Sequence, residues 1–197
     1  MFGPGMPNVL PALFPGLRPN EDSTELLRFG LLDAVPANGE SWFLASVFRH
    51  LAREGVAAVV SFSDPVVRRR ADEQLVAPGH VGTCYAAASA IYTGRTAPVA
   101  YRMFPEDAGL LHPRMLAKYR AGAPNAGAVE RALVAHGAPL RAHAEDRASY
   151  LDRWLPHLTV PFQHSGLHRY AFAIGPHARA VRIAQPALPY PGRVARS

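Results

Sequence analysis

The sequence predicts an α/β fold built around a parallel pair of strands that a helix connects. Two apolar runs of strand length, 25–35 and 56–62, are separated by large apolar side chains that recur at helical spacing: Trp42, Phe43, Val47, Phe48 and Leu51. The run 56–62 is continuously apolar, which is typical of a parallel strand covered on both faces. Strand, helix and strand in this order form a βαβ unit.

The remaining pattern extends this α/β organisation. We expect a loop or short exposed helix over 63–79, a close-packed helix from 82 that ends near Gly94, a strand at 99–104, helices at 113–120 and 126–136, and a strand at 168–174. Prolines make the stretch after Gly175 irregular. The expected organisation is a poorly ordered Pro/Gly-rich leader over 1–24, one domain over 25–192 and a tail over 193–197.

Composition indicates a packed globular protein with a positive surface. Of the 197 residues, 49% are hydrophobic and 18% are charged, which suits one domain with a real core. The net charge is +6, and Lys118 is the only lysine. Arginine matches phosphate with two parallel hydrogen bonds, so this balance favours DNA or a nucleotide cofactor as partner. An Ala- and Arg-rich composition also follows from GC-biased coding, so charge alone leaves DNA binding open.

Other classes of protein are disfavoured. Cys84 is the single cysteine, which excludes an internal disulfide and fits a cytoplasmic protein. The apolar N-terminus is broken by prolines and lacks a basic segment, so neither a signal peptide nor a membrane helix is expected. The nine histidines form no metal-binding pair, and no GxSxG turn is present, so neither a metal site nor serine-nucleophile chemistry is predicted.

The turn Asn38-Gly39-Glu40-Ser41 is the first candidate binding element. It precedes the predicted helix, whose first backbone amides and positive dipole end would form an anion pocket for a pyrophosphate. Ser41 would cap the helix and Gly39 would let a phosphate approach the backbone. The same residues also suit an ordinary helix start, and the sequence leaves both interpretations open.

Two further residues are candidates for proton transfer. Asp64 follows the second predicted strand at its carboxyl end, where open α/β sheets bind ligands, although Asp before Pro is also a common turn. Tyr85 lies among small residues in the predicted helix from 82, where its phenol would protonate a leaving thiolate or simply be a core residue. The basic run Arg68-Arg69-Arg70 is either a phosphate contact or a solvated turn.

Several segments, in this order, resemble the Mom-like proteins of phages. They are RFGLLD at 28–33, NGESWFL at 38–44, VSFSDP at 60–65, GHVGTCYAA at 79–87, IYTG at 91–94, HRYAF at 168–172 and PYP at 189–191. The resemblance spans residues 25–192. It implies a GNAT-like mixed sheet and an enzyme that places a carbamoylmethyl-type group on the exocyclic amine of adenine in DNA, which protects DNA against restriction.

The resemblance also implies roles for residues. Asp64 and Tyr85 match the family's candidates for proton transfer, and Asn38 to Ser41 stand where GNAT proteins hold the pyrophosphate of an acyl-CoA, with acetyl-CoA the expected donor. Arg28 and Ser41 match positions that line the cofactor and substrate cleft. Besides Arg28, we expect Arg68, Arg69, Arg70, His80 and Arg169 to bind the substrate, although the first three of these lie in a connection that departs from the family pattern. Iron is a further cofactor to consider, which the histidine spacing does not support.

Departures from the family pattern leave alternatives open. The usual N-terminal strands are not evident before residue 25, the 64–79 connection is longer than usual, and Leu167 replaces a more usual lysine. A short N-terminus would leave a sheet edge that invites a homodimer, and it would fit an inactive remnant or a DNA-associated domain. An N-acyltransferase acting on a small amine or a protein is the other alternative.

Overall fold

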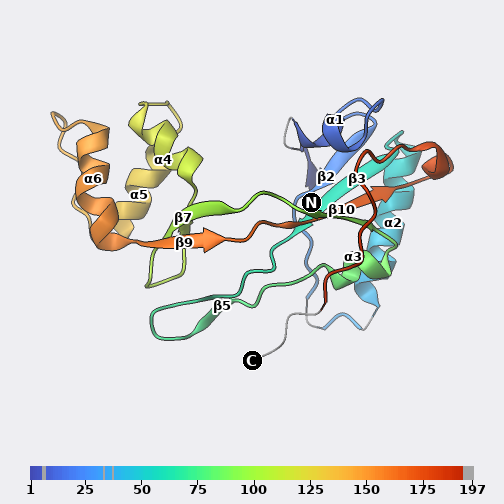
Figure 1. Cartoon of the computed structure of the whole chain (residues 1–197), viewed down its shortest axis with the longest axis horizontal. Helices are drawn as coiled ribbons and strands as arrows, with labels where there is room; N and C mark the ends of the chain where they lie inside the picture. The colour runs from blue at the N-terminus through green and yellow to red at the C-terminus, as the bar shows by residue number, and fades with distance from the viewer. Residues whose placement is uncertain (6–7, 33, 37, 193–197) are drawn as a thin grey trace. The chain divides into compact units, whose positions relative to one another are not determined.

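In a computed structural model, five strands form one mixed sheet in the order β1-β2-β3-β10-β6 (Figure 1). The structure describes residues 1–5, 8–32, 34–36 and 38–192, so the expected tail at 193–197 lies outside the described residues. The strands are β1 (Phe2–Gly3), β2 (Ser23–Leu26), β3 (Ala58–Ser63), β6 (Ile91–Arg95) and β10 (His168–Ala173). Only β2 and β3 run parallel among the described neighbours in this sheet.

The predicted βαβ unit is confirmed. Helix α2 (Gly39–Arg53) connects β2 to β3, and the two strands pair in parallel with Leu26 opposite Ser61. The first strand is shorter than the predicted 25–35, because the chain leaves the sheet after Leu26. The apolar side chains beyond it are not buried as a strand's would be: Leu32 is 80% exposed. The described residues of this stretch, 27–32 and 34–36, therefore form a loop.

Helices cover both faces of this sheet. Leu44 and Phe48 of α2 pack on one face with Val59, Tyr170 and Phe172. On the other face, α1 (Val9–Leu13) packs its buried leucines against Val60 and Ala171. The segment 1–24, expected to be a poorly ordered leader, thus supplies β1, α1 and the start of β2, because Leu10, Leu13 and Phe14 are fully buried.

The last part of the chain also packs on the sheet. After β10 the chain forms a short 3-10 helix, η1 (Ala178–Ala180), and then continues without regular structure, as its prolines predict. Val181 and Ile183 still pack against the face that α1 covers. The amide of Leu188 donates a hydrogen bond of 2.9 Å to the carbonyl of Tyr92, which fixes the end of the described chain beside β6.

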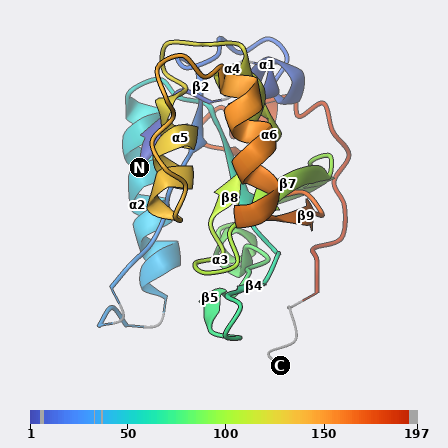
Figure 2. The same ribbon diagram turned by 90° about the vertical axis from the view of Figure 1, so that its left-hand side faces the viewer.

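A second compact unit comprises residues 66–79 and 97–166, where the sequence predicted a single domain over 25–192. Its three-stranded sheet has the order β8-β7-β9, formed by β7 (Val99–Met103), β8 (Leu110–Leu111) and β9 (Val160–His164). Three helices accompany it (Figure 2): α4 (Pro113–Arg120), α5 (Gly127–Ala135) and α6 (Arg147–Leu158).

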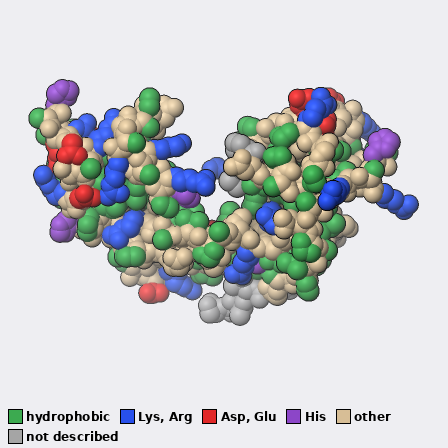
Figure 3. Space-filling model, turned by 45° about the horizontal axis from the view of Figure 1, so that its top comes forward, with side chains coloured by type: hydrophobic (Ala, Val, Ile, Leu, Met, Phe, Trp, Pro, Cys, Tyr) green, Lys and Arg blue, Asp and Glu red, His purple; other side chains and the backbone are tan. Residues whose placement is uncertain are grey.

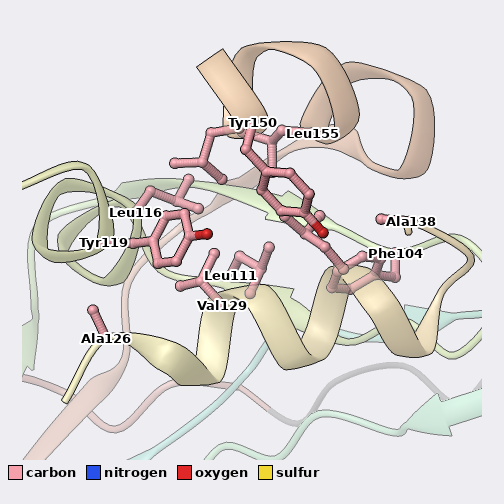
Figure 4. Packing of buried hydrophobic residues seen from close by; sticks show 11 residues of the cluster. Phe104, Leu111, Leu116, Tyr119, Ala126, Val129, Ala138, Tyr150 and Leu155 are labelled. Carbon is pink, nitrogen blue, oxygen red and sulfur yellow. The ribbon is translucent and has the colours of Figure 1, made fainter. Parts of the chain in front are cut away.

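The second unit has its own core. Figure 4 shows the side chains of Tyr119, Val129 and Tyr150, from α4, α5 and α6, pointing toward one another. Tyr119, Val129, Leu133, Tyr150 and Leu151 are all fully buried. Three helices that bury large side chains in a common cluster can hold this unit together independently of the five-stranded sheet.

Helices α4 and α5 and strand β7 lie where the sequence predicted them, whereas other segments differ. The stretch 63–79 contains a two-stranded hairpin, β4 (Arg68–Arg69) with β5 (Leu75–Ala77), in place of a loop or helix. The helix from residue 82, α3 (Thr83–Ala87), ends before Gly94, because Tyr92 and Thr93 are buried in β6. Helix α6 and strand β9 were not predicted. In the described residues, no helix is long and apolar enough to cross a membrane.

Candidate functional site

Helix α2 begins at the carboxyl end of the parallel strands, where α/β sheets place their ligands. Its N-cap residue is Asn38, in the left-handed conformation (φ 75°), and not Ser41 as predicted. The Ser41 hydroxyl instead donates to the Asn38 carbonyl (3.1 Å). Gly39 is needed here because a Cβ atom would lie 2.2 Å from Cγ1 of Val35.

The first turn of α2 contains two described backbone hydrogen bonds: the amide of Gly39 donates to the carbonyl of Pro36 and that of Trp42 to the carbonyl of Asn38, both at 3.0 Å. The first amides of a helix lie at the positive end of its dipole and are the usual elements of an anion site.

A pocket of about 560 Å³ opens beside this turn. Asn38 and Ser41 line it at one end, and Ala87, Ala88 and Ser89 close it from the end of α3. Its α2 wall continues through Trp42, Ala45 and Phe48. Of the four predicted cofactor residues, Asn38 and Ser41 therefore line a cavity of a size that suits a small-molecule ligand.

Tyr85, in α3, is not among the residues that line this pocket and lies in a cluster of aromatic side chains. It is only 4% exposed, and its ring lies 5.2 Å from that of Tyr170 and 6.3 Å from that of His80, between centroids. Burial raises the pKa of the Tyr85 phenol, although a hydrogen bond with Ser61 opposes the shift. The phenol is therefore neutral at neutral pH and carries a proton that it can donate.

The sheet beneath Tyr85 is unusually polar for a core. Ser61 and Ser63 of β3 point to the same face, and their partners on β10 are Tyr170 and His168 respectively. Burial raises the pKa of Tyr170 to about 12, and its hydroxyl donates to the carbonyl of Val81. The Ser61 hydroxyl donates to the carbonyl of Leu26 (3.3 Å), whereas the Ser63 hydroxyl is buried with no hydrogen-bond partner among the described residues.

Glu40 and Asp64 place negative charge around the same group of side chains. The charge of Glu40 acts on Tyr85, Cys84 and His80, and that of Asp64 acts on His80. Burial, and then Glu40, raise the pKa of the Cys84 thiol to about 11, so this cysteine is not a thiolate nucleophile. The amide of His80 donates to the Asp64 carbonyl (2.7 Å), which fixes the two chain segments together.

The structure thus brings Asp64, Tyr85, His80 and Glu40 to one end of the sheet. Desolvation lowers the pKa of the His80 imidazole, while the two carboxylates oppose that shift. A neutral phenol, an imidazole and two carboxylates give this end of the sheet both proton donors and proton acceptors.

His168 belongs to this site, and sequence reasoning did not select it. It is 1% exposed, and its Nδ1 lies 2.8 Å from the Tyr92 hydroxyl. Its pKa is lowered by burial first and then by Arg95 and His80. The alternation of His168, Tyr170 and Phe172 along one strand was the available signal, since alternate residues share a face.

Other predicted substrate-binding residues lie elsewhere. Arg169 is on the opposite face of β10 from Tyr170 and donates to the side chain and the carbonyl of Thr93, both at 2.9 Å. Arg28 is exposed beside the N-terminus, where its carbonyl accepts a bond of 2.8 Å from the terminal amine. Neither is brought to Tyr85 by a contact in the described structure.

Arg68, Arg69 and Arg70 belong to the second unit and make contacts within it. The guanidinium groups of Arg69 and Arg70 donate to the carbonyls of Glu73 and Glu106, at 2.9 and 2.7 Å. The predicted solvated turn is therefore a hairpin that two of these arginines hold in shape. Among the described residues, no group of three or more His, Cys, Asp or Glu side chains is placed to hold a metal ion.

These features define a mixed α/β protein with a polar, aromatic-lined site at the carboxyl end of its parallel strands. A sequence model of the Mom protein family matches residues 1–192. The chain belongs to the Mom family, a family of DNA-modifying proteins. A sequence comparison with curated proteins finds no match.

Proposed function

We propose that this protein transfers an acyl or carbamoylmethyl-type group from a CoA-type donor to the exocyclic amine of adenine in DNA. The observation that carries the proposal is that Asp64, His80 and Tyr85 lie together: the His80 amide donates to the Asp64 carbonyl (2.7 Å), and the rings of His80 and Tyr85 are 6.3 Å apart between centroids. Glu40, in the first turn of α2, adds its negative charge to the surroundings of His80 and Tyr85. Family membership supports DNA as the substrate. The parallel pair β2 and β3, joined by α2, is the element on which a GNAT-like donor site would be built.

The donor would bind at the start of α2. The amides of Glu40 and Ser41 would contact its pyrophosphate, and the pocket lined by Asn38, Ser41 and Trp42 has room for the adjoining part of the molecule. Acetyl-CoA is the simplest donor of this class.

A carboxylate would activate the adenine amine. The lone pair of this amine is delocalised into the ring, so the nitrogen must be oriented and must lose a proton as its new bond forms. Asp64 and Glu40 are the groups here that can accept that proton. A base in a duplex is shielded by stacking, so the adenine must be flipped out or taken from a single strand.

Tyr85 would assist the leaving group. When the transferred group is an acyl group, the amine nitrogen bonds to the donor's carbonyl carbon, the carbon–sulfur bond breaks and the electron pair leaves with sulfur. The neutral Tyr85 phenol can give its proton to that thiolate, while the carboxylate holds the proton of the amine. Each bond that forms is thereby matched by one that breaks. A carbamoylmethyl group would instead bond to the nitrogen through its methylene carbon, with the leaving group departing from that carbon.

Mass spectrometry of nucleosides tests the proposal. DNA incubated with active protein in a host lysate, then digested, should contain a mass-shifted deoxyadenosine. Tyr85→Phe should reduce its yield by roughly 10²–10⁴-fold, the usual contribution of a general acid. Tyr150→Phe is the matched control, since this buried tyrosine also loses one hydroxyl but packs in the core of the second unit. Unmodified deoxyadenosine with the unaltered protein would refute the proposal, and acylation of amines other than DNA would favour an N-acyltransferase.

A further inference from the structure

The second unit is formed by two insertions into the sequence of the first, residues 66–79 and 97–166. The chain leaves the first unit after Pro65 and again after Thr96, and it returns at His80 and Leu167. Hydrogen bonds close both junctions: His80 donates to Asp64 (2.7 Å), and Thr96 and Leu167 exchange two bonds of 2.9 Å. The ends of the two insertions are therefore adjacent in sequence to Asp64, His80 and His168 of the first unit.

The charges of the second unit are unevenly compensated. Residues 66–79 and 97–166 contain eleven Lys or Arg against eight Asp or Glu, a net charge of +3. Four of its eight carboxylates pair with arginines of the same unit: Asp152 with Arg120 (2.6 Å), Glu145 with Arg153 (3.1 Å), Glu130 with Arg141 (3.5 Å) and Asp72 with Arg70 (3.8 Å). The excess positive charge must then come from cations without such partners.

Arg114 and Lys118 are two of these cations. Both are exposed, and they lie one turn apart on the same face of α4. Within residues 66–79 and 97–166, all of which are described, no carboxylate pairs with either of them. Figure 3 shows Lys and Arg side chains on the surface of the part of the molecule that carries α4, at the left of the view.

We propose that the face of α4 bearing Arg114 and Lys118 binds the phosphate backbone of duplex DNA. Unpaired cations release counterions when they contact phosphates, whereas Arg120 and Arg153 are already neutralised by carboxylates. The first unit then carries the groups that react with adenine, and the second unit carries the contact with the DNA backbone. This inference rests on DNA being the substrate, as proposed above.

Salt-dependent binding of the full chain to a labelled 30-bp duplex tests the inference. Arg114→Gln with Lys118→Gln should lower the slope of log K against log salt by about 2, one unit for each phosphate contact, and equally on two unrelated sequences. Arg120→Gln with Arg153→Gln is the control, because it removes the same formal charge from the same unit. The control should change the slope much less. Circular dichroism establishes that both double variants are folded.

Each outcome is decisive. Equal slopes for the two double variants would show that only net charge matters, and an unchanged slope for the α4 variant would show that the DNA lies elsewhere; either result overturns the inference. The proposed chemistry is tested separately, by the amount of mass-shifted deoxyadenosine. A reduced slope without modified deoxyadenosine would support the α4 surface and refute the proposed chemistry. Modified deoxyadenosine with an unchanged slope would support the chemistry and refute the α4 surface.

Discussion

Replacing Gly82 by alanine should damage the fold and the candidate site together. Gly82 is the residue before α3 and has φ 66°, in the left-handed region. A Cβ atom there would lie 2.7 Å from Cε2 and Cζ of Tyr170 and 2.8 Å from Cδ2 of Tyr85. These are rings of the buried cluster, held by packing on all sides, so neither can move aside without disturbing the other.

Two separate contributions determine how much Gly82→Ala should lower the free energy of unfolding. A non-glycine residue in the left-handed region costs roughly 1–2 kcal/mol, and forcing an extra methyl into a packed core costs about 1–3 kcal/mol more. Gly82→Ala should therefore lower the free energy of unfolding by about 2–5 kcal/mol. Because it displaces the ring of Tyr85, it should also lower the yield of modified deoxyadenosine by more than its effect on the folded fraction.

Gly55→Ala isolates the steric contribution. Gly55 follows α2 with φ 92°, and no atom lies within 4 Å of the position that a Cβ would take there. This variant should cost only the backbone penalty, roughly 1–2 kcal/mol, and should keep the site intact. Denaturant unfolding, with hydrogen exchange of the β3 and β10 amides as the local reporter, measures both variants. Equal destabilisation by the two substitutions would refute the reasoning, since it would mean that Tyr85 and Tyr170 do not close around Gly82.

Two further predictions concern stability. Burial lowers the pKa of His168, so below about pH 6.5 the unfolded chain takes up a proton that the folded state does not. The free energy of unfolding should therefore fall as the pH drops. In denaturant titrations, His168→Gln should reduce that fall between about pH 7 and 5.5. An unchanged pH slope would contradict the burial of a neutral imidazole. Leu133→Ala should destabilise the second unit by about 2–5 kcal/mol through the cavity it leaves, seen as faster hydrogen exchange in α4–α6 with β3 and β10 unaffected. Exchange that rises equally in β3 and β10 would show that the two units unfold as one.

The sequence predicted the part of the fold that rests on local pattern. The βαβ unit, α4 and α5 follow from continuous or periodic apolar residues that the structure buries as expected. The strand β6 was missed because Ile91 to Arg95 follow an alanine-rich helix without a proline break, and only pairing with β10 makes them a strand. The leader was misjudged because its Pro/Gly content hid Leu10, Leu13 and Phe14, whose burial depends on a sheet formed by distant residues.

The candidate site could likewise be predicted only in part from the sequence. Position along the chain placed Asp64 at the end of a strand and Asn38 at the start of a helix, and both locations agree with the structure. The face on which a side chain lies was harder to predict: Arg169 and His168 are neighbours in sequence, yet one contacts Thr93 while the other lies buried against Tyr92. Nothing in the sequence distinguished them before the register of β10 against β3 and β6 was known.

Glu40 connects the two proton transfers of the proposed reaction. Its negative charge contributes to the raised pKa of Tyr85, after burial, and so helps to keep the phenol protonated while the donor binds. If Glu40 takes the proton of the amine, that charge disappears and the pKa of Tyr85 falls, which makes the phenol a stronger acid when the thiolate leaves. Glu40→Gln should therefore lower the pKa of Tyr85, measured by ultraviolet difference titration against Tyr85→Phe. An unchanged titration would show that the carboxylate and the phenol act independently and would leave Asp64 as the base.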